Sequence, residues 1–223
     1  MFSSRTAPWI LSLLSLLLIV GSVAAQGVTD QVGNLSNPAS SVPGLFHGDQ
    51  MFAYLIDPDM ETACQTDGFK LEAVHMYLDF SPSQVPVTFQ IAGGLTAAVP
   101  DPSGQEFVPG EDLCVSPVQT VTITTPGLHV VTVAMDQTCG CMPIDQAYFL
   151  TLMFFGPVEG QLVIDDIPEP GVVFWNNGAG WEDMFGVDKT SGGKVIIWGD
   201  IVCCTTAIGT DSNTWGQVKT LFR

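Results

Sequence analysis

The segment FKLEAVHMYLDF, residues 69–80, decides the fold class of this chain. Large apolar side chains stand at every second position from 74 to 80, and a different set stands between them. The first set is Val74, Met76, Leu78 and Phe80, and the second is Ala73, His75, Tyr77 and Asp79. Because successive side chains of a strand point to opposite faces, this period of two predicts a half-buried β-strand.

Eight further segments have the length and composition of strands, and residues that favour turns separate them. They are Phe52–Ile56, Val85–Ala92, Val118–Thr125, Leu128–Met135, Tyr148–Phe155, Gln161–Ile164, Val172–Trp175 and Val195–Val202. Pro126 and Gly127 predict a turn, so the third and fourth of these segments make the clearest hairpin. Pro86 cannot donate a ladder hydrogen bond, which predicts a sheet edge for its strand. Tyr148–Phe155 is apolar on both faces, which predicts a central strand.

No amphipathic helix stands out between these strands, and most of the gaps carry Pro, Gly, Asp or Asn. This pattern predicts an all-β protein, an antiparallel β-sandwich that is jelly-roll-like and stabilised by disulfides. Residues 49–223 are predicted to form a single β-sandwich domain, because the roughly fifty residues after the loop Asp165–Gly171 would make a poor core alone. Residues 26–48 are predicted to be a polar N-terminal arm or linker.

The first 25 residues have the pattern of a signal peptide. Arg5 precedes the apolar run Ile10–Val20, and the small residues Gly21–Ala25 follow it. The run is too short to span a bilayer, so we expect cleavage near Ala25 and no transmembrane span in the mature chain. The protein is therefore expected to be secreted or on the cell surface. Asn34 begins an Asn-Leu-Ser glycosylation sequon, which matters in a eukaryotic secretory route.

The mature chain carries an even number of cysteines, which in an exported protein indicates disulfides. They are Cys64, Cys114, Cys139, Cys141, Cys203 and Cys204. If Cys203 and Cys204 continue a strand, they point to opposite faces and have different partners. We expect one of them to bond Cys64, and Cys114 to bond Cys139 or Cys141.

The formal net charge of the chain is −17. A field of that sign repels phosphate backbones and argues against a nucleic-acid partner. The acidic residues are scattered, and 46% of the chain is hydrophobic, so the charge suits a soluble exported protein with a packed core.

Calcium is the one cofactor that the sequence suggests. Asp57, Asp59 and Glu61 place three carboxylates two residues apart, and calcium binds oxygen ligands from such loops. The spacing does not match an EF-hand, and a solvated loop has the same composition. These three residues are the candidate metal ligands.

Two tryptophans flank a glycine-rich loop near the C-terminal end of the strand series. Sugar rings stack on flat aromatic side chains, while amides and carboxylates bond their hydroxyls. The candidate ligand-binding residues are Trp175, Asn176, Asn177, Trp181 and Asp183. Tryptophan is also a common packing residue in sandwiches. Trp198 alternates with Ile196 along a strand and is expected in the core.

Catalytic chemistry has little support in the sequence. The chain has no G-x-S-x-G elbow, no H-E-x-x-H helix and no P-loop, so no catalytic residue is assigned and we do not expect an enzyme. His75, Tyr77 and Asp79 share a strand face that could line a site, although the wet side of a sheet has the same pattern. A pair of carboxylates can always be found among 23 acids, so a hydrolase stays open.

Several segments together resemble uncharacterised secreted acidic β-sandwich proteins of environmental bacteria, which carry cysteines. They are Ala73–Phe80 (AVHMYLDF), Thr125–Val133 (TPGLHVVTV), Asn177–Asp183 (NGAGWED) and Ile196–Asp200 (IIWGD). The resemblance covers most of the mature chain, and its motifs are structural. It implies the same fold and no catalytic residues.

These observations support three hypotheses. The first is a non-catalytic secreted or cell-surface module that binds extracellular glycans, with or without calcium. The second is a structural subunit that assembles with copies of itself, because the polar arm could add to the sheet edge of a neighbour. The third is a carboxylate-dependent hydrolase.

Overall fold

Two antiparallel sheets make up the part of the chain that the structure describes. The structure is a computed structural model, and it describes residues 29–62, 64, 68–101, 107–136, 139–184 and 192–204. The predicted signal peptide, residues 1–25, lies outside these ranges. Across the same ranges, no helix has the length and apolar character needed to cross a bilayer.

The first sheet, named sheet A, has the strand order β1-β13-β4-β10-β2, and β8 pairs with β4. Its strands are β1 (Thr29–Gly33), β2 (Ser40–His47), β4 (Phe69–Phe80), β8 (Gly127–Ala134), β10 (Glu159–Ile164) and β13 (Ile197–Cys203). The strand β4 has the predicted bounds, and its two faces are assigned as the alternation predicts: Val74, Met76 and Leu78 are buried.

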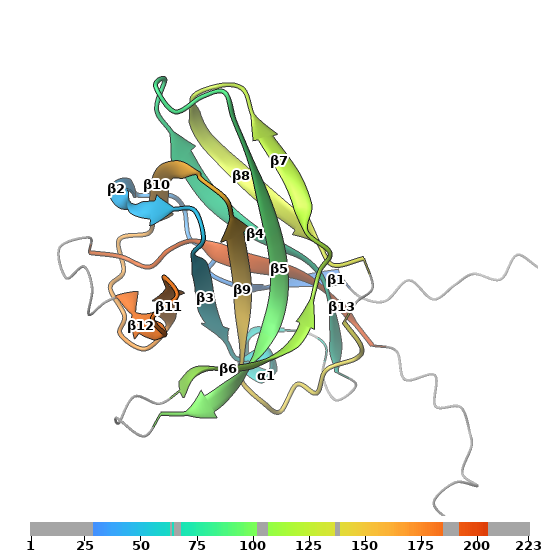
Figure 1. Ribbon diagram of the computed structural model, residues 1–223. Coiled ribbons are helices and arrows are strands. Elements are labelled where there is room, and N and C mark those ends of the chain that lie inside the picture. The colour runs from blue at the N-terminus through green and yellow to red at the C-terminus, as the bar shows by residue number, and fades with distance from the viewer. Residues whose placement is uncertain are drawn as a thin grey trace, which may run out of the picture.

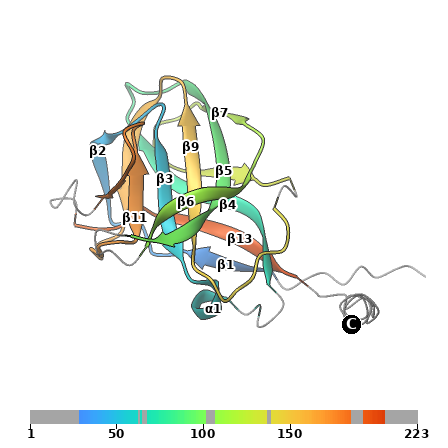
Figure 2. The same ribbon diagram turned by 60° about the horizontal axis from the view of Figure 1, so that its bottom comes forward.

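The second sheet, named sheet B, has the order β12-β11-β3-β9-β5-β6, and β7 pairs with β5. Its strands are β3 (Met51–Ile56), β5 (Val87–Pro100), β6 (Phe107–Val115), β7 (Gln119–Ile123), β9 (Tyr148–Phe155), β11 (Val173–Asn176) and β12 (Trp181–Asp183). Sheet A passes behind β3, β9 and β5, and the short helix α1 (Pro58–Glu61) lies beside β1 (Figures 1 and 2). The all-β sandwich-like prediction is confirmed.

The core lies between the two sheets. Phe154 of β9 packs edge-on against Phe46 of β2, with ring centroids 4.7 Å apart, and also contacts the rings of Phe52 and Phe89. The strand β9 pairs with β3 on one side and β5 on the other, so the prediction of a central strand is confirmed. Its other face carries Phe149, which packs against the Phe174 ring on the outside of sheet B.

The predicted hairpin around Pro126 is wrong. The strand β7 pairs with β5 in sheet B, whereas β8 pairs with β4 in sheet A, so the turn connects the two sheets. At the ends of the two strands away from the turn, the Gln119 side chain bridges them, because its amide bonds both the carbonyl and the N–H of Ala134. Each strand has one apolar face, and each buries that face against the core instead of pairing with the other.

The predicted edge position of the strand after Pro86 is also wrong. The strand β5 begins at Val87, so Pro86 lies before the paired residues, and its missing N–H removes no hydrogen bond from the sheet. The strand pairs with β9 on one side and with β6 and β7 on the other. It is therefore a central strand of sheet B.

The segment predicted as a polar arm or linker, residues 26–48, supplies two strands to sheet A. Within the described residues, β1 pairs with β13 and β2 pairs with β10. Val32 and Phe46 from this segment are fully buried in the core. A few buried apolar side chains thus attach a largely polar stretch to the sheet.

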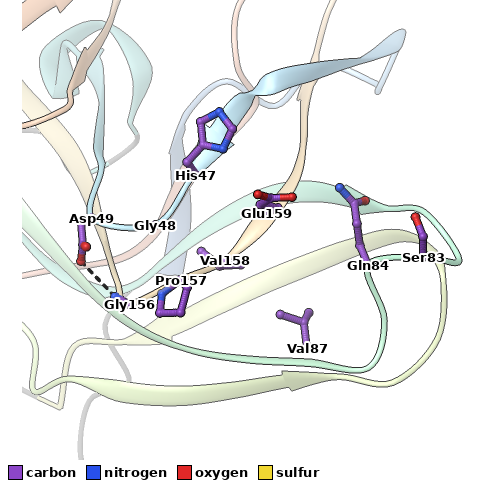
Figure 3. Close-up of a pocket in the computed structure, with 10 residues that line it drawn as sticks. All are labelled: His47, Gly48, Asp49, Ser83, Gln84, Val87, Gly156, Pro157, Val158 and Glu159. Carbon is purple, nitrogen blue, oxygen red and sulfur yellow. Dashed lines mark hydrogen bonds between the residues drawn. The ribbon is translucent and has the colours of Figure 1, made fainter.

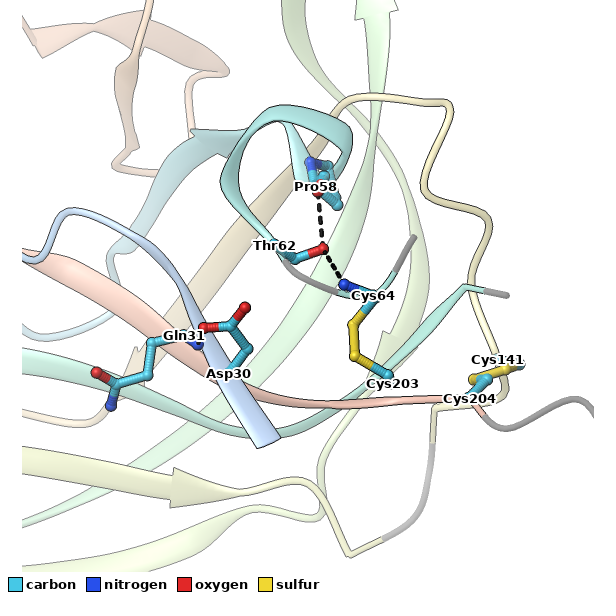
Figure 4. Close-up of a disulfide and its surroundings, with 8 residues drawn as sticks. All are labelled: Asp30, Gln31, Pro58, Thr62, Cys64, Cys141, Cys203 and Cys204. Carbon is cyan, nitrogen blue, oxygen red and sulfur yellow. Dashed lines mark hydrogen bonds between the residues drawn. A yellow bond between two sulfur atoms is a disulfide. The ribbon is translucent and has the colours of Figure 1, made fainter. Parts of the chain in front are cut away.

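Three disulfides connect the ends of the strands: Cys64–Cys203, Cys114–Cys139 and Cys141–Cys204. The two adjacent cysteines have different partners, as the strand geometry predicts. Figure 4 shows their two disulfides side by side where β13 ends, with the segment after α1 on one side and the loop before β9 on the other. Disulfides of this kind indicate an oxidising, extracellular environment.

Candidate functional site

A group of aromatic side chains stands on the outer face of sheet A. Trp198 of β13 lies directly opposite His75 of β4, and the two rings stack with centroids 4.9 Å apart and planes inclined by 16°. The Tyr77 ring lies 5.1 Å from the indole on the same face. Trp198 does alternate with Ile196, but this face points away from the core, so the expectation of a core tryptophan is wrong. The three residues before Trp198, Val195 to Ile197, are all apolar, so the strand has apolar side chains on both faces. Alternation alone therefore cannot identify which face points inward.

A row of hydrogen bonds fixes these rings across four strands. His75 Nδ1 lies 2.9 Å from the Thr132 hydroxyl of β8, and His75 Nε2 lies 2.9 Å from Asp200 Oδ2 of β13. The other oxygen of Asp200 accepts a bond of 2.8 Å from the Gln31 amide of β1. The imidazole is thereby held in one orientation, with the indole stacked on it. Thr132, Asp200 and the Trp198 indole thus position the His75 ring within an aromatic surface.

Trp198 lines a hollow of about 240 Å³. His75 stacks on one face of its indole, and Gly33 of β1 lies opposite Trp198 in the ladder. The hollow is lined by Gln31, Asn34, Leu35, Ser36, Asn37, Tyr77, Ile196 and Trp198. An aromatic wall beside amide groups is the arrangement that a sugar ring requires, with stacking on one side and hydrogen bonds at its rim.

A buried hydrogen bond between Asn34 and Asp165 fixes the residues that line this hollow next to β1. Asn34 is 3% exposed, and its amide donates to Asp165 Oδ2 at 3.0 Å and to the Val195 carbonyl at 3.2 Å. Its own side-chain oxygen accepts from the Ser36 N–H, which turns the chain at Leu35. The sequon asparagine is therefore a structural residue whose nitrogen is engaged inside the fold.

The candidate metal ligands lie on one short helical turn. Glu61 Oε1 accepts from the Asp57 N–H at 2.8 Å, and Oε2 accepts from the Gly33 N–H at 2.7 Å. Burial raises the pKa of Glu61, whereas these two N–H groups lower it. Burial, followed by the charge of Glu61, raises the pKa of Tyr54. Glu61 thus fixes the end of β1 beside the hollow.

Asp59 is exposed on the same turn. It is two positions from both Asp57 and Glu61, and residues two apart on a helix do not face each other, so its carboxylate points away from theirs. Within the ranges that the structure describes, no group of three or more His, Cys, Asp and Glu side chains has the arrangement of a metal site. Calcium binding by Asp57, Asp59 and Glu61 stays a prediction.

The candidate binding loop folds as the hairpin of β11 and β12. Trp175 packs on the core cluster with its indole N–H buried, whereas Trp181 packs on the outside of sheet B. Trp181 lies opposite Asn176 and Trp175 lies opposite Glu182, so the two indoles are on opposite faces. The structure therefore does not bring the two tryptophans together, and each remains partly exposed.

The polar side chains of this hairpin bond its own backbone. Asn176 Oδ1 accepts from the N–H groups of Gly178 and Gly180, and Asn177 Oδ1 accepts from that of Ala179. Asp183 Oδ2 accepts from the Gly171 N–H at 3.0 Å. These bonds shape the turn, whose residues 177–180 are exposed while Trp181 is partly exposed.

A larger hollow of about 530 Å³ lies where the turns of both sheets meet. Figure 3 shows Asp49 at one end of it and Gln84 with Ser83 at the other, with Glu159 between them. Asp49 Oδ1 accepts from the Gly156 N–H at 3.0 Å, and Gln84 Oε1 accepts from the backbone of Ser81. Two carboxylates thus line an open hollow, and one of them stabilises a turn.

Comparisons with known proteins define the family and the fold. The family model described as "Domain of unknown function (DUF7451)" matches residues 31–200. No curated protein matches the chain. Among solved structures, the clostridial cysteine protease Cwp84 after propeptide cleavage is similar, with a TM-score of 0.51 and 12% identity over 79% of this chain and 40% of that chain.

A second structure contains the cysteine protease and lectin-like domains of Cwp84, a surface layer associated protein of Clostridium difficile. Its TM-score is 0.46, and its identity is 12% over 71% of this chain and 33% of that chain. The chain therefore spans two fifths or less of the length of these proteins. At this identity the similarity to the first structure concerns the fold alone.

Proposed function

This chain belongs to the family of the domain of unknown function DUF7451, and we propose that it is a non-catalytic extracellular module that binds glycans on the outer face of sheet A. One observation carries the proposal: Trp198, whose indole stacks on His75, lines a hollow together with the amide-bearing side chains of Gln31 and Asn37. A pyranose ring stacked there has its apolar face on the indole and its hydroxyls within reach of the amides.

The hydrogen-bonded row beneath the rings supports the same function. A binding surface gains affinity when its side chains are ordered before the ligand arrives, because less conformational entropy is lost on binding. His75, Asp200 and Gln31 hold the indole through contacts that a ligand does not need to disturb. Trp198 is therefore a preorganised stacking surface.

The hairpin of β11 and β12 is the second candidate site for the same function. The partly exposed indole of Trp181, beside the exposed side chain of Asn177, favours it. The side-chain oxygen of Asn177 bonds the backbone of the turn, and Trp175 points to the other face. The hairpin therefore offers a ligand a single aromatic ring. The outer face of sheet A offers two rings and a hollow.

Substitution of Trp198 and of Trp181, one variant each, separates these sites. We expect Trp198→Ala to weaken glycan binding by about two- to tenfold, because an aromatic stack contributes about 0.5–1.5 kcal/mol beyond area burial. We expect Trp181→Ala to change the affinity by less than about twofold. The exported, oxidised protein and both variants are screened on a glycan array and by polysaccharide pull-down, in calcium and in chelator.

The exposed side chain of Asn37 gives a second variant that leaves the aromatic group intact. We expect Asn37→Ala to weaken binding by about threefold, the cost of one hydrogen bond. Loss of binding in Trp181→Ala with Trp198→Ala unaffected would move the site to the hairpin. No binding under any condition would reject the function and favour a subunit that assembles with copies of itself.

A further inference from the structure

The turn between β11 and β12 contains an Asn-Gly pair, Asn177 and Gly178. The two strands pair as far as Asn176 opposite Trp181, so residues 177–180 connect them, and all of these residues are exposed. Gly178 has a φ of 95°, in the left-handed region that glycine enters without strain. A Cβ added at Gly178 would meet no other part of the described fold within 4 Å. The turn therefore has room for a covalent rearrangement of its own backbone.

The side chain of an asparagine in such a turn reacts with the next backbone nitrogen, and water is the only co-reactant. Hydroxide removes the proton of the Gly178 N–H, and the nitrogen attacks Cγ of Asn177, so that an N–Cγ bond forms and a succinimide ring closes. The bond between Cγ and Nδ2 breaks, and Nδ2 leaves as ammonia with a proton from water, which restores the hydroxide. Water then adds to one ring carbonyl, and the ring opens to aspartate or isoaspartate. No atom is oxidised or reduced.

The other asparagines in the described part of the chain lack one of the requirements for this reaction. Asn34 is 3% exposed, and its amide nitrogen donates two hydrogen bonds inside the fold. Asn37 precedes Pro38, whose nitrogen carries no hydrogen and cannot attack a side chain. Asn176 precedes another asparagine, whose Cβ crowds the attacking nitrogen. Among these residues, Asn177 alone combines an exposed side chain with a following glycine.

One hydrogen bond in the turn favours the attack. Asn177 Oδ1 accepts from the Ala179 N–H at 3.2 Å. The bond orients the side-chain amide along the turn. It also places a donor on the oxygen that becomes negative while the carbonyl is attacked, and such a donor stabilises the transition state.

A second contact opposes the attack. Asn176 Oδ1 accepts from the Gly178 N–H at 2.7 Å and from the Gly180 N–H at 3.3 Å. The attacking nitrogen must leave this bond before it can react. Because the hydrogen bonds of an exposed turn open at little cost in free energy, the bond slows the reaction and does not prevent it.

We infer that Asn177 is a site of spontaneous deamidation through the Gly178 nitrogen, and that the side chain of Asn176 sets its rate. The aspartate product adds a negative charge to a hairpin that already carries Glu182 and Asp183. The isoaspartate product adds a carbon to the main chain and lengthens the turn. The site belongs to sheet B, so the inference is independent of glycan binding on sheet A.

The test follows the exported, oxidised protein during incubation at physiological temperature, from neutral to mildly alkaline pH. Peptide mapping by mass spectrometry identifies which asparagine changes from amide to carboxylate, and a protein isoaspartyl methyltransferase detects isoaspartate. We expect both products at Asn177 and no conversion at Asn34 or Asn37. The rate is expected to rise in proportion to hydroxide concentration, because the attacking species is the deprotonated nitrogen.

Two variants of Asn176 and one of Asn177 provide the matched controls. Asn177→Gln keeps the amide, but its longer side chain must close a larger ring, so no conversion is expected at this position. Asn176→Ala is expected to raise the rate at Asn177 by about two- to tenfold, the factor that one hydrogen bond is worth. Asn176→Asp keeps acceptor oxygens and is expected to retain the slow rate.

Three results would overturn the inference. The first is no conversion at Asn177 in the folded protein, whether or not the reduced, unfolded chain is converted. The second is conversion at Asn34 or Asn37 at the same rate, which would show that the turn selects nothing. The third, an unchanged rate in Asn176→Ala, would overturn the role of Asn176.

Discussion

Replacing Asp165 with alanine is expected to lower the free energy of unfolding by about 3–5 kcal/mol. The side chain belongs to a residue that is 1% exposed and accepts three hydrogen bonds, from the Asn34 amide and from the N–H groups of Ile167 and Lys194. Without the carboxylate, two backbone donors and part of an amide lose their acceptor in a buried site. Chemical denaturation of the oxidised protein measures the loss.

Asp166 provides the control for this prediction. It is the next residue and is exposed, so Asp166→Ala is expected to change the free energy of unfolding by less than about 0.5 kcal/mol. Asp165→Asn is expected to lie between the two, because it keeps one acceptor oxygen and places a donor against the Asn34 amide. Similar stability of Asp165→Ala and Asp166→Ala would contradict the role of Asp165 as the support of the residues around Asn34.

Removal of the Cys64–Cys203 disulfide is expected to lower the free energy of unfolding by about 4 kcal/mol. The bonded residues are 139 positions apart, so the bridge restricts a long loop of the unfolded chain. In the fold it ties the segment after α1 to the end of β13. The double variant Cys64→Ser and Cys203→Ser, followed by thermal and denaturant unfolding, measures the effect.

The Cys114–Cys139 disulfide is the comparison for this prediction. Its cysteines are 25 positions apart, so the loop is shorter, and its removal is expected to cost about 3 kcal/mol. A larger loss from this second pair than from Cys64–Cys203 would show that loop length does not set the order of the two contributions.

The sequence predicts those elements whose local pattern has one interpretation. The strand at Phe69–Phe80 alternates from Val74 to Phe80, and Tyr148–Phe155 is apolar on both faces, so both have the predicted bounds. The turn at Pro126 was compatible with a hairpin and with a crossing between sheets, and the choice depends on which partner strand is free to pair. Such long-range pairing has no signal within the segment itself.

The strands at the N-terminal end show a different limit. Gln31 and Ser41 lie in strands β1 and β2, although the segments around them are polar and contain glycine and proline. Edge strands bury few side chains, here chiefly Val32 and Phe46, so their composition resembles that of a linker. Their assignment to sheet A follows from pairing with β13 and β10.

The candidate site was only partly visible in the sequence. The alternation in β4 predicts that His75 and Tyr77 share a face, and in the structure both rings lie against Trp198 on that face. Trp198 was assigned to the core because it alternates with Ile196, but the residues before it are apolar in both phases. The signal that identifies its direction is Asp200, two residues on, since a carboxylate on the same face favours solvent over core.

The central claim is that glycans bind on the outer face of sheet A, against Trp198. The most direct test follows the indole N–H signals of Trp175, Trp181 and Trp198 by NMR in isotope-labelled, oxidised protein while glucosamine hexamer or N-acetylglucosamine hexamer is added. The account predicts that the Trp198 signal moves with ligand concentration, while the signals of Trp175 and Trp181 stay in place. Movement of the Trp181 signal with Trp198 unchanged, or no movement of any indole signal with either hexamer, would contradict it.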